Sequence, residues 1–356
     1  MVPLGMKSLV GLLITLMLCV SCESNTSGNT VLNDPSALPL GAEVSGITFG
    51  GHLVGKKAYL LGSDINLPNC WIDSVVWKDQ NLYFAVAGID YTALANGQGL
   101  NADDECSLPD NQIDIHFDMY SASLENGEWD ITAIGVNDTG SQAGLDYNTG
   151  TLAYTQYPAD NNWEIYFSDF SGGVWGSPES YSQNSSCRED NPHIFDDGNK
   201  IIFESSRTVA DGSVCDSTPD NKYLYLSTKT GSTWSSPVAI NGVPGVGAKN
   251  TQPWFDEEND YLYWTADTEC GCVRRVSFDG STVSGDSEDI LTPALGELAG
   301  GTADGKVVFL GEYSEQDNYA FFACGIASDV DPSGSTVGLF NGRYKVDIQL
   351  CVIPLE

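Results

Sequence analysis

Apolar and polar residues alternate with a period of two along most of the chain, and no segment shows a convincing 3.6-residue apolar period. This pattern predicts antiparallel strands joined by tight turns. Five copies of one turn-and-strand core are recognisable, at 78–84, 147–154, 197–203, 258–264 and 304–309, and a partial copy lies at 55–60. Asp-Gly, Asn-Asp and Asn-Thr-Gly turns open several of these cores, as in hairpins.

Three of the copies continue into a Gly turn followed by a Trp, at Trp129, Trp175 and Trp234. Such a ring on an outer strand is well placed to pack between two neighbouring sheets. A four-stranded meander cannot bury both of its faces alone, whereas several meanders arranged around an axis can. The predicted fold is all-β, a single β-propeller of five or six four-stranded antiparallel blades. If the strand at Tyr344–Val352 pairs with residues 46–62, the ring has five blades.

The stretch 190–237 carries a family resemblance, through Pro192, the turn Asp197-Gly198 and the ending Trp234 to Pro237. Asp304-Gly305-Lys306 and Gln252-Pro253-Trp254-Phe255 repeat parts of the pattern. These residues resemble the WD40-like, TolB-type propeller repeats (PD40). The resemblance implies a propeller with a binding or scaffolding role in the cell envelope, and it implies no catalytic residues.

The N-terminal residues predict export. Lys7 precedes an apolar run, Ser8–Ser21, which is too short to span a bilayer with ease but suits a signal peptide. The run ends at Cys22, and small residues before a Cys resemble the lipobox of bacterial lipoproteins. We therefore expect a lipoprotein signal peptide at 1–21, lipidation of Cys22, a flexible tether at 22–40 and the propeller at 41–356. The expected location is the bacterial cell envelope, with the chain lipid-anchored at the outer membrane or cell surface. An ordinary secretory peptide is the alternative.

The chain is strongly acidic, with 49 Asp and Glu against 15 Lys and Arg and a formal net charge of −34. This charge argues against nucleic acid or an anionic membrane surface as a partner. The expected partners are an envelope protein or an extracellular glycan, with membrane contact only through the lipid anchor, and the chain is expected to be a monomer.

Cysteines of the exported part are even in number, which favours disulfides: Cys70, Cys106, Cys187, Cys215, Cys270, Cys272, Cys324 and Cys351. Eight cysteines allow 105 pairings. Pairing 70 with 106, 187 with 215 and 324 with 351 would keep each bridge inside one repeat, and 270 with 272 would form a tight local bridge.

Ligand contacts are expected from the first strand of each blade, because that strand lines the central channel. The catalytic candidates are Asp73, Asp190 and His193. Paired carboxylates of this kind could hydrolyse a glycosidic bond. The candidate ligand-binding residues are Arg188, Arg207, Gln252 and Trp254, and the two arginines could clamp an anion. A polar channel rim that is merely wet explains the same residues.

No cofactor is expected with certainty, and Ca²⁺ is the one that the sequence suggests. Asp329, Asp331 and Ser333, followed by Gly334, resemble the first half of a calcium loop. The acidic twelfth position is absent, because Phe340 stands there, and a plain turn explains the same residues.

These patterns favour an exported lipoprotein propeller that acts as a binding or scaffolding module, and more weakly an enzyme. The alternative is a carbohydrate-active hydrolase or lyase, either sialidase-like or like a five-bladed glycosidase, with acidic residues at the central channel. Ser227–Trp234 matches a sialidase Asp box except that Lys229 replaces the defining Asp.

Overall fold

The computed structural model describes residues 38–66, 70–88, 117–125, 127–138, 140–157, 162–218, 221–243, 250–266, 271–293, 305–330 and 344–356. They belong to one compact unit, Ser36–Glu356. Within these ranges every regular element is a β-strand, apart from one 3-10 turn, η1 (Gly51–Leu53). No helix in the same ranges is long and apolar enough to cross a membrane. The all-β prediction is confirmed.

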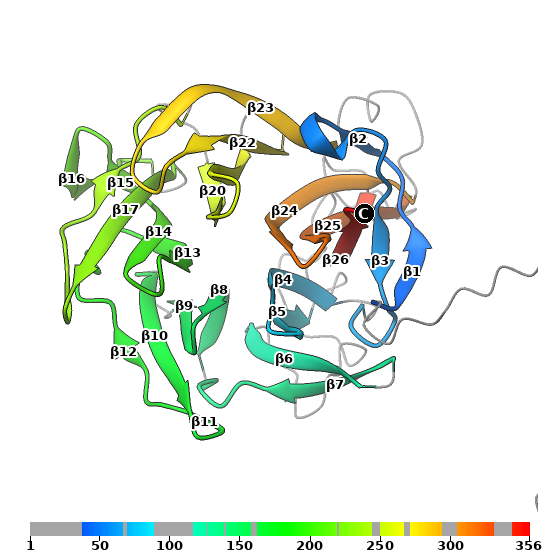
Figure 1. Ribbon diagram of the computed structural model, residues 1–356, viewed down its shortest axis with the longest axis horizontal. Coiled ribbons are helices and arrows are strands. Elements are labelled where there is room, and N and C mark those ends of the chain that lie inside the picture. Colours follow the sequence, from blue (N-terminus) through cyan, green and yellow to red (C-terminus); the bar gives the residue numbers. More distant parts are fainter. Residues whose placement is uncertain are drawn as a thin grey trace, which may run out of the picture. The chain divides into compact units, whose positions relative to one another are not determined.

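Five units of four or five strands follow one another around the ring (Figure 1). Blade 1 contains β4 (Cys70–Lys78), β5 (Asn81–Gly88), β6 (Asp118–Glu125) and β7 (Glu128–Ala133). Blade 2 contains β8 (Ser141–Asn148), β9 (Thr151–Tyr157) and β10 (Glu164–Ser171), with β11 (Val174–Trp175) and β12 (Glu179–Ser180) both paired to β10. Blade 3 contains β13 (Glu189–Phe195), β14 (Lys200–Ser205) and β17 (Tyr223–Thr230), with β18 (Thr233–Trp234) and β19 (Val238–Ala239) outside.

Blade 4 contains β20 (Asn250–Asp256), β21 (Tyr261–Ala266), β22 (Cys272–Phe278) and β23 (Val283–Pro293), extended by β2 (Ile47–Phe49). Blade 5 contains β24 (Val307–Gln316), β25 (Tyr319–Val330), β26 (Tyr344–Pro354), β3 (Tyr59–Leu61) and β1 (Leu40–Glu43). A short hairpin, β15 (Arg207–Thr208) with β16 (Asp211–Cys215), projects from blade 3.

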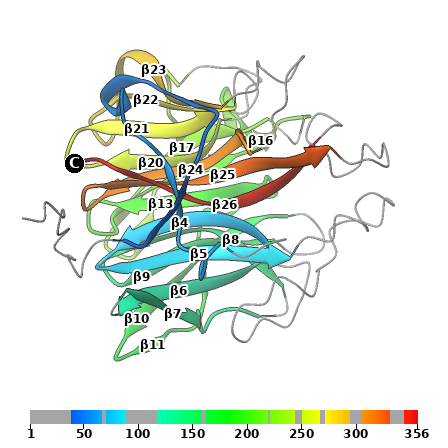
Figure 2. The ribbon, with the colours of Figure 1, turned by 90° about the vertical axis from the view of Figure 1, so that its right-hand side faces the viewer.

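The first strands of the five blades, β4, β8, β13, β20 and β24, each contact the next, and β24 returns to β4. They therefore form a closed inner ring. In the side view the long strands β4, β5, β24, β25 and β26 run across the picture, along the direction of the ring axis (Figure 2). We call the face where these inner strands begin the upper face, and the face where they end the lower face.

Strand pairing between distant segments closes the ring. In blade 5, β26 pairs antiparallel with β3, with Cys351 opposite Leu60 and Val352 opposite Tyr59. The predicted pairing of Tyr344–Val352 with residues 46–62 is confirmed, so the described residues form five blades and not six.

Hydrophobic clusters fill the spaces between blades. The described residues form five such clusters, and each joins side chains of two neighbouring blades. Trp129, Trp175 and Trp234 all belong to these clusters or pack against them. The Trp234 ring of blade 3 stacks on Phe167 of blade 2, with centroids 5.5 Å apart. Aromatic pairs of this kind are worth about 0.5–1.5 kcal/mol beyond their buried area. The predicted role of the Trp residues is confirmed.

Two disulfides join described residues, Cys187–Cys215 and Cys324–Cys351, with Cα atoms 5.2 Å and 5.9 Å apart. Both match the pairing expected within one repeat. Cys70 and Cys272 are also disulfide-bonded. Their predicted partners, Cys106 and Cys270, lie outside the described residues.

Candidate active site

The inner strands share a backbone irregularity that places polar groups on the ring axis. The ladder between the first and second strands slips at the same point in every blade: after Asp73, Ala143, Asp190, Thr251 and Leu310. Such β-bulges bend a strand and re-aim its side chains, and they are frequent beside functional sites.

Four of these bulges contain a residue with a left-handed backbone: Ser74 (φ 56°), Gly144 (φ 55°), Asn191 (φ 46°) and Gln252 (φ 55°). For a residue other than glycine this conformation costs on the order of 1–3 kcal/mol. The surrounding ladders must hold these residues in place, so the axis of the ring is a position where the fold tolerates strain.

Asp190 is held at the axis by donors from two blades. Its Oδ1 accepts a hydrogen bond from the Tyr157 hydroxyl at 2.6 Å and from the Asn191 amide at 2.9 Å. Gly144 of the neighbouring blade passes so close that a Cβ there would lie 2.9 Å from Asp190 Oδ1. Only a glycine fits at this point of β8.

Glu204 sits directly opposite Asp190 across the β13–β14 ladder. Its Oε1 accepts a hydrogen bond from Lys222 Nζ at 3.0 Å, and its Oε2 accepts one from the backbone amide of Gln252 at 3.0 Å. The Lys222–Glu204 ion pair is almost fully buried, with side chains 6% and 3% exposed. A buried pair of this kind fixes geometry because neither charge can move away from the other.

Gln252 ties the carboxylates together. Its Nε2 donates to Asp73 Oδ1 at 3.4 Å, and its Oε1 accepts the Glu312 amide at 2.9 Å. Asp73, Asp190, Glu204 and Glu312, which come from blades 1, 3 and 5, thus converge; we call them the axial carboxylates. Glu312 Oε2 is buried, has no hydrogen-bond partner among the described residues, and lines a cavity of about 30 Å³ on the axis.

Crowding of carboxylates changes their proton affinities. Burial raises the pKa of Asp73 to about 6, and the charge of Glu204 adds to this shift while the Ser74 amide opposes it. Burial also raises the pKa of Asp190, to about 7; the charge of Glu204 adds to the shift, and Lys222 opposes it. The pKa of Glu312 lies well above its usual range, first through burial and then through the charge of Asp73. Strongly perturbed carboxyls that share a channel are typical of acid–base sites.

An aromatic and cationic group lies beside the axial carboxylates at the upper face. Trp163, just before β10, has its ring centre 4.7 Å from the Arg188 guanidinium carbon and 4.6 Å from Lys222 Nζ. Its ring also meets that of Tyr157 edge-on, with centroids 4.8 Å apart. Continuous contacts therefore run from Asp190 through Tyr157 and Trp163 to Arg188.

His193 does not join Asp73 and Asp190. It follows the bulge in β13, so it lies nearer the lower face, where its Nδ1 is 2.9 Å from Asp146 Oδ2. Trp254 lies at the same level, and both line a funnel of about 490 Å³ that also includes Asp256 and Glu315. The structure thus brings together two of the three predicted catalytic residues and places the third deeper in the channel.

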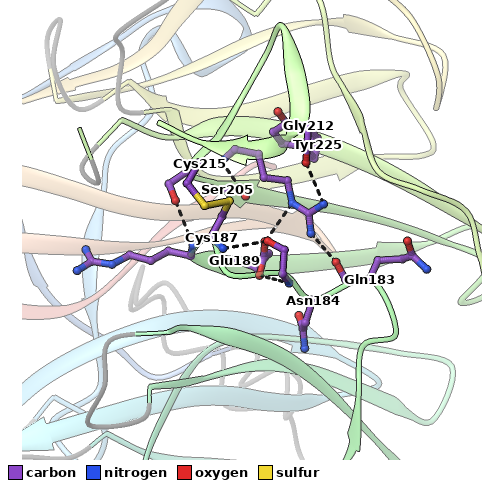
Figure 3. Close-up of polar contacts among 12 residues, drawn as sticks. Gln183, Asn184, Cys187, Glu189, Ser205, Gly212, Cys215 and Tyr225 are labelled. Carbon is purple, nitrogen blue, oxygen red and sulfur yellow. Dashed lines mark hydrogen bonds and ion pairs between the residues drawn. A yellow bond between two sulfur atoms is a disulfide. The ribbon is translucent and has the colours of Figure 1, made fainter. Parts of the chain in front are cut away.

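Arg207 does not form the predicted anion clamp with Arg188. It is buried and donates to Glu189 Oε1 at 3.0 Å and to the Gly212 carbonyl at 3.3 Å. Figure 3 shows Glu189 and Gly212 in this group next to the Cys187–Cys215 disulfide. Arg207 follows the end of β14 and turns into the β15–β16 hairpin, away from the axis. Its contacts hold that hairpin against blade 3.

The predicted calcium loop lies outside what the structure describes. Asp331 and Ser333 fall in 331–343, and Asp329 has a described backbone in β25 but no described side chain. Across the described ranges, no group of three or more His, Cys, Asp or Glu side chains is placed to hold a metal ion. Calcium therefore stays a prediction.

Sequence reasoning missed several members of the site: Tyr157, Trp163, Glu204, Lys222 and Glu312. Glu204 lies on the second strand of its blade, and candidates were sought only on first strands. The bulges that bring such second-strand residues to the axis cannot be recognised from residue types, except at Gly144. The charged residues Glu204 and Lys222 could have been noticed because Glu204 follows the apolar run of its own strand and Lys222 directly precedes the apolar start of the next.

No protein-family model and no curated protein matches the chain. Solved structures with a similar arrangement of strands include a GH43_1 enzyme from Xanthomonas citri, with 9% identity, a TM-score of 0.47 and coverage of 84% of this chain and 91% of that one. A TolB protein from Agrobacterium tumefaciens has 12% identity, a TM-score of 0.39 and coverage of 80% and 79%. A prolyl endopeptidase has 12% identity and a TM-score of 0.33. That match covers 82% of this chain but only 39% of the endopeptidase.

These likenesses are too distant to carry an argument about function. The class of protein rests on the chain's own structure: a five-bladed β-propeller whose axis holds four carboxylates at the upper face.

Proposed function

We propose that the chain is a glycoside hydrolase whose reaction takes place at the axial carboxylates. The observation that carries the proposal is the pair Asp73 and Asp190, whose pKa values are raised to about 6 and about 7 around one shared neighbour, Glu204. Two carboxyls with separated proton affinities supply an acid and a base at the same pH, which is what cleavage of a glycosidic bond requires.

Asp190 is the general acid in this mechanism and Asp73 the general base. Protonated Asp190 gives its proton to the glycosidic oxygen as the bond from that oxygen to the anomeric carbon breaks. Asp73 takes a proton from the water whose oxygen forms the new bond to the anomeric carbon. One water is consumed, and proton exchange with solvent restores both carboxyls.

Glu204 and Lys222 act through these groups. The charge of Glu204 raises the pKa of both aspartic acids, and Lys222 keeps that charge in place at 3.0 Å. The Tyr157 hydroxyl orients Asp190 through its 2.6 Å hydrogen bond. Burial raises the pKa of Tyr157 well above its usual value, so it remains a hydrogen-bond donor.

Hydrolysis of chromogenic aryl glycosides and of neutral and acidic oligosaccharides by the purified chain tests this proposal. We expect Asp73→Asn and Asp190→Asn each to lower kcat by about 10²–10⁴-fold on any substrate that is cleaved. Asp79→Asn is the matched control, because Asp79 lines the funnel at the lower face. Cleavage of no member of the panel, or equal rates in all four proteins, would overturn the proposal.

A binding module without catalysis is the second candidate, favoured by the Trp163 and Arg188 arrangement, which suits recognition and needs no reaction. Comparison of the wild-type protein with Asp190→Asn separates the two functions. For a binding module, the wild-type protein binds a glycan without cleaving it. For a hydrolase, the wild-type protein cleaves the glycan and Asp190→Asn binds it without turnover.

We also propose that the protein is exported and lipid-anchored in the cell envelope. The apolar run before Cys22 supports this location, and the disulfides fit an oxidising compartment. In a bacterial host, the wild-type chain is expected in the membrane fraction and Cys22→Ser in the soluble fraction. Recovery of both in the soluble fraction would count against the anchor.

A further inference from the structure

Arg188 differs from the other described arginines. Arg207, Arg274 and Arg275 each pair with a carboxylate, at 3.0, 2.7 and 2.7 Å. No carboxylate of the described residues pairs with Arg188, although the chain contains 49 acidic residues. The side chain is half-buried, and its described contact is the Trp163 ring. Its hydrogen-bonding edge is therefore available to a ligand.

The position of Arg188 puts it next to the axial carboxylates. It stands two residues before Asp190, and alternate residues of an extended chain face the same side about 7 Å apart. The intervening Glu189 faces away and pairs with Arg207. On the axial side, Trp163 contacts both Arg188 and Lys222. Lys222 is occupied by Glu204, so among the described residues Arg188 is the cation left to meet a ligand there.

The chemistry of this group selects an anion. Packing on an indole holds a guanidinium through a cation–π contact and leaves its N–H groups free. That planar fork matches a carboxylate, which it can bind through two parallel hydrogen bonds. The axial carboxylates repel an anion at the point of cleavage. The anionic group must therefore lie on a neighbouring sugar unit, displaced from the axis toward Arg188.

We propose that Arg188 binds the carboxylate of a uronic acid unit adjacent to the bond that is cleaved, so the substrate is an acidic glycan. This inference rests on the proposed function for its position relative to the reaction. Arg188 determines specificity here, Trp163 positions it, and neither takes part in proton transfer.

Binding of matched oligosaccharides tests the inference. The probes are oligogalacturonides and oligoglucuronides, their methyl esters, which have the same rings without the charge, and sulfated oligosaccharides of equal length. Calorimetry on the Asp190→Asn variant measures affinity without turnover. We expect at least one acid form to bind about 10-fold more tightly than its ester, because a hydrogen-bonded ion pair is lost on esterification.

The same measurement with Arg188→Gln added should abolish the preference for the acid form. Arg274→Gln, which removes an arginine on blade 4, should keep it. An unchanged melting temperature in Arg188→Gln shows that the fold is intact. Equal binding of acid and ester, binding of none of the uronate probes, an Arg188-independent preference, or tighter Arg188-dependent binding of the sulfated probes would each overturn the uronate assignment.

The outcomes also separate this inference from the proposed function. Asp73-dependent cleavage of neutral glycans with no preference for acid forms leaves the hydrolase standing and removes the uronate site. Arg188-dependent binding of uronates without any cleavage supports the uronate site and removes the hydrolase.

Discussion

Replacing Gly144 by alanine tests whether the axial site depends on the close approach of two inner strands. The new Cβ would lie 2.7 Å from Asn191 Oδ1, 2.9 Å from Asp190 Oδ1 and 2.9 Å from Thr155 Oγ1. Three contacts this short force these side chains to shift, and two of the oxygens belong to residues at the bulge of β13.

Two terms make up the expected cost. The left-handed backbone of Gly144, with φ +55°, costs an alanine about 1–2 kcal/mol. Overpacking a tight interior costs about 1–3 kcal/mol more. Gly144→Ala should therefore lose about 2–5 kcal/mol of unfolding free energy, from these two ranges together.

Gly231 supplies a matched control. Its φ is +63° and nothing lies within 4 Å of the Cβ position, so Gly231→Ala carries the backbone term alone. Equilibrium unfolding in urea gives both free energies from the midpoints, provided that the slopes agree. Because Gly144→Ala also displaces Asp190, it should lower kcat, whereas Gly231→Ala should not. Equal loss of stability in the two variants would refute the close approach.

Three further predictions concern charge. The rate of hydrolysis should rise with pH as Asp73 loses its proton near pH 6 and fall as Asp190 loses its proton near pH 7. A rate that does not change from pH 5 to pH 8 would exclude the assigned acid and base. The same raised pKa values mean that the folded protein binds more protons than the unfolded chain above the ordinary carboxyl pKa of about 4. Stability should therefore decrease from about pH 4 to about pH 7, and urea midpoints should show a shallower decrease in Asp73→Asn. Lys222→Met leaves the buried charge of Glu204 without its counter-ion and should cost about 3–5 kcal/mol. Adding Glu204→Gln should restore much of this loss in thermal unfolding, and an unaltered melting temperature in Lys222→Met would contradict the buried pair.

The propeller could be predicted from the sequence because its determinants are local and repeated. Alternation of apolar residues, turns such as Asp197-Gly198 and the outer-strand Trp residues each encode one blade, and a blade that buries nothing alone needs neighbours. Closure was also predictable, since one strand near each end of the chain lacked a partner.

The candidate site was only partly predictable. Asp73, Asp190 and Gln252 were found because they occur on first strands. Glu204 and Glu312 were missed, and His193 was grouped with Asp190, because the bulge at Asn191 changes which side chains share a level of the channel. Asn and Gln adopt the required left-handed backbone only under the constraint of the finished ladders, so residue type does not reveal the bulge.

The pairing of Leu60 with Cys351 has a consequence for how the protein is made. The strand that contains Leu60 is made almost three hundred residues before the strand that covers its edge. Until then both sides of the gap expose strand edges that can recruit other chains. A chain whose synthesis or export stops early is therefore a fragment with exposed strand edges that is prone to aggregate, and it is not a smaller stable protein.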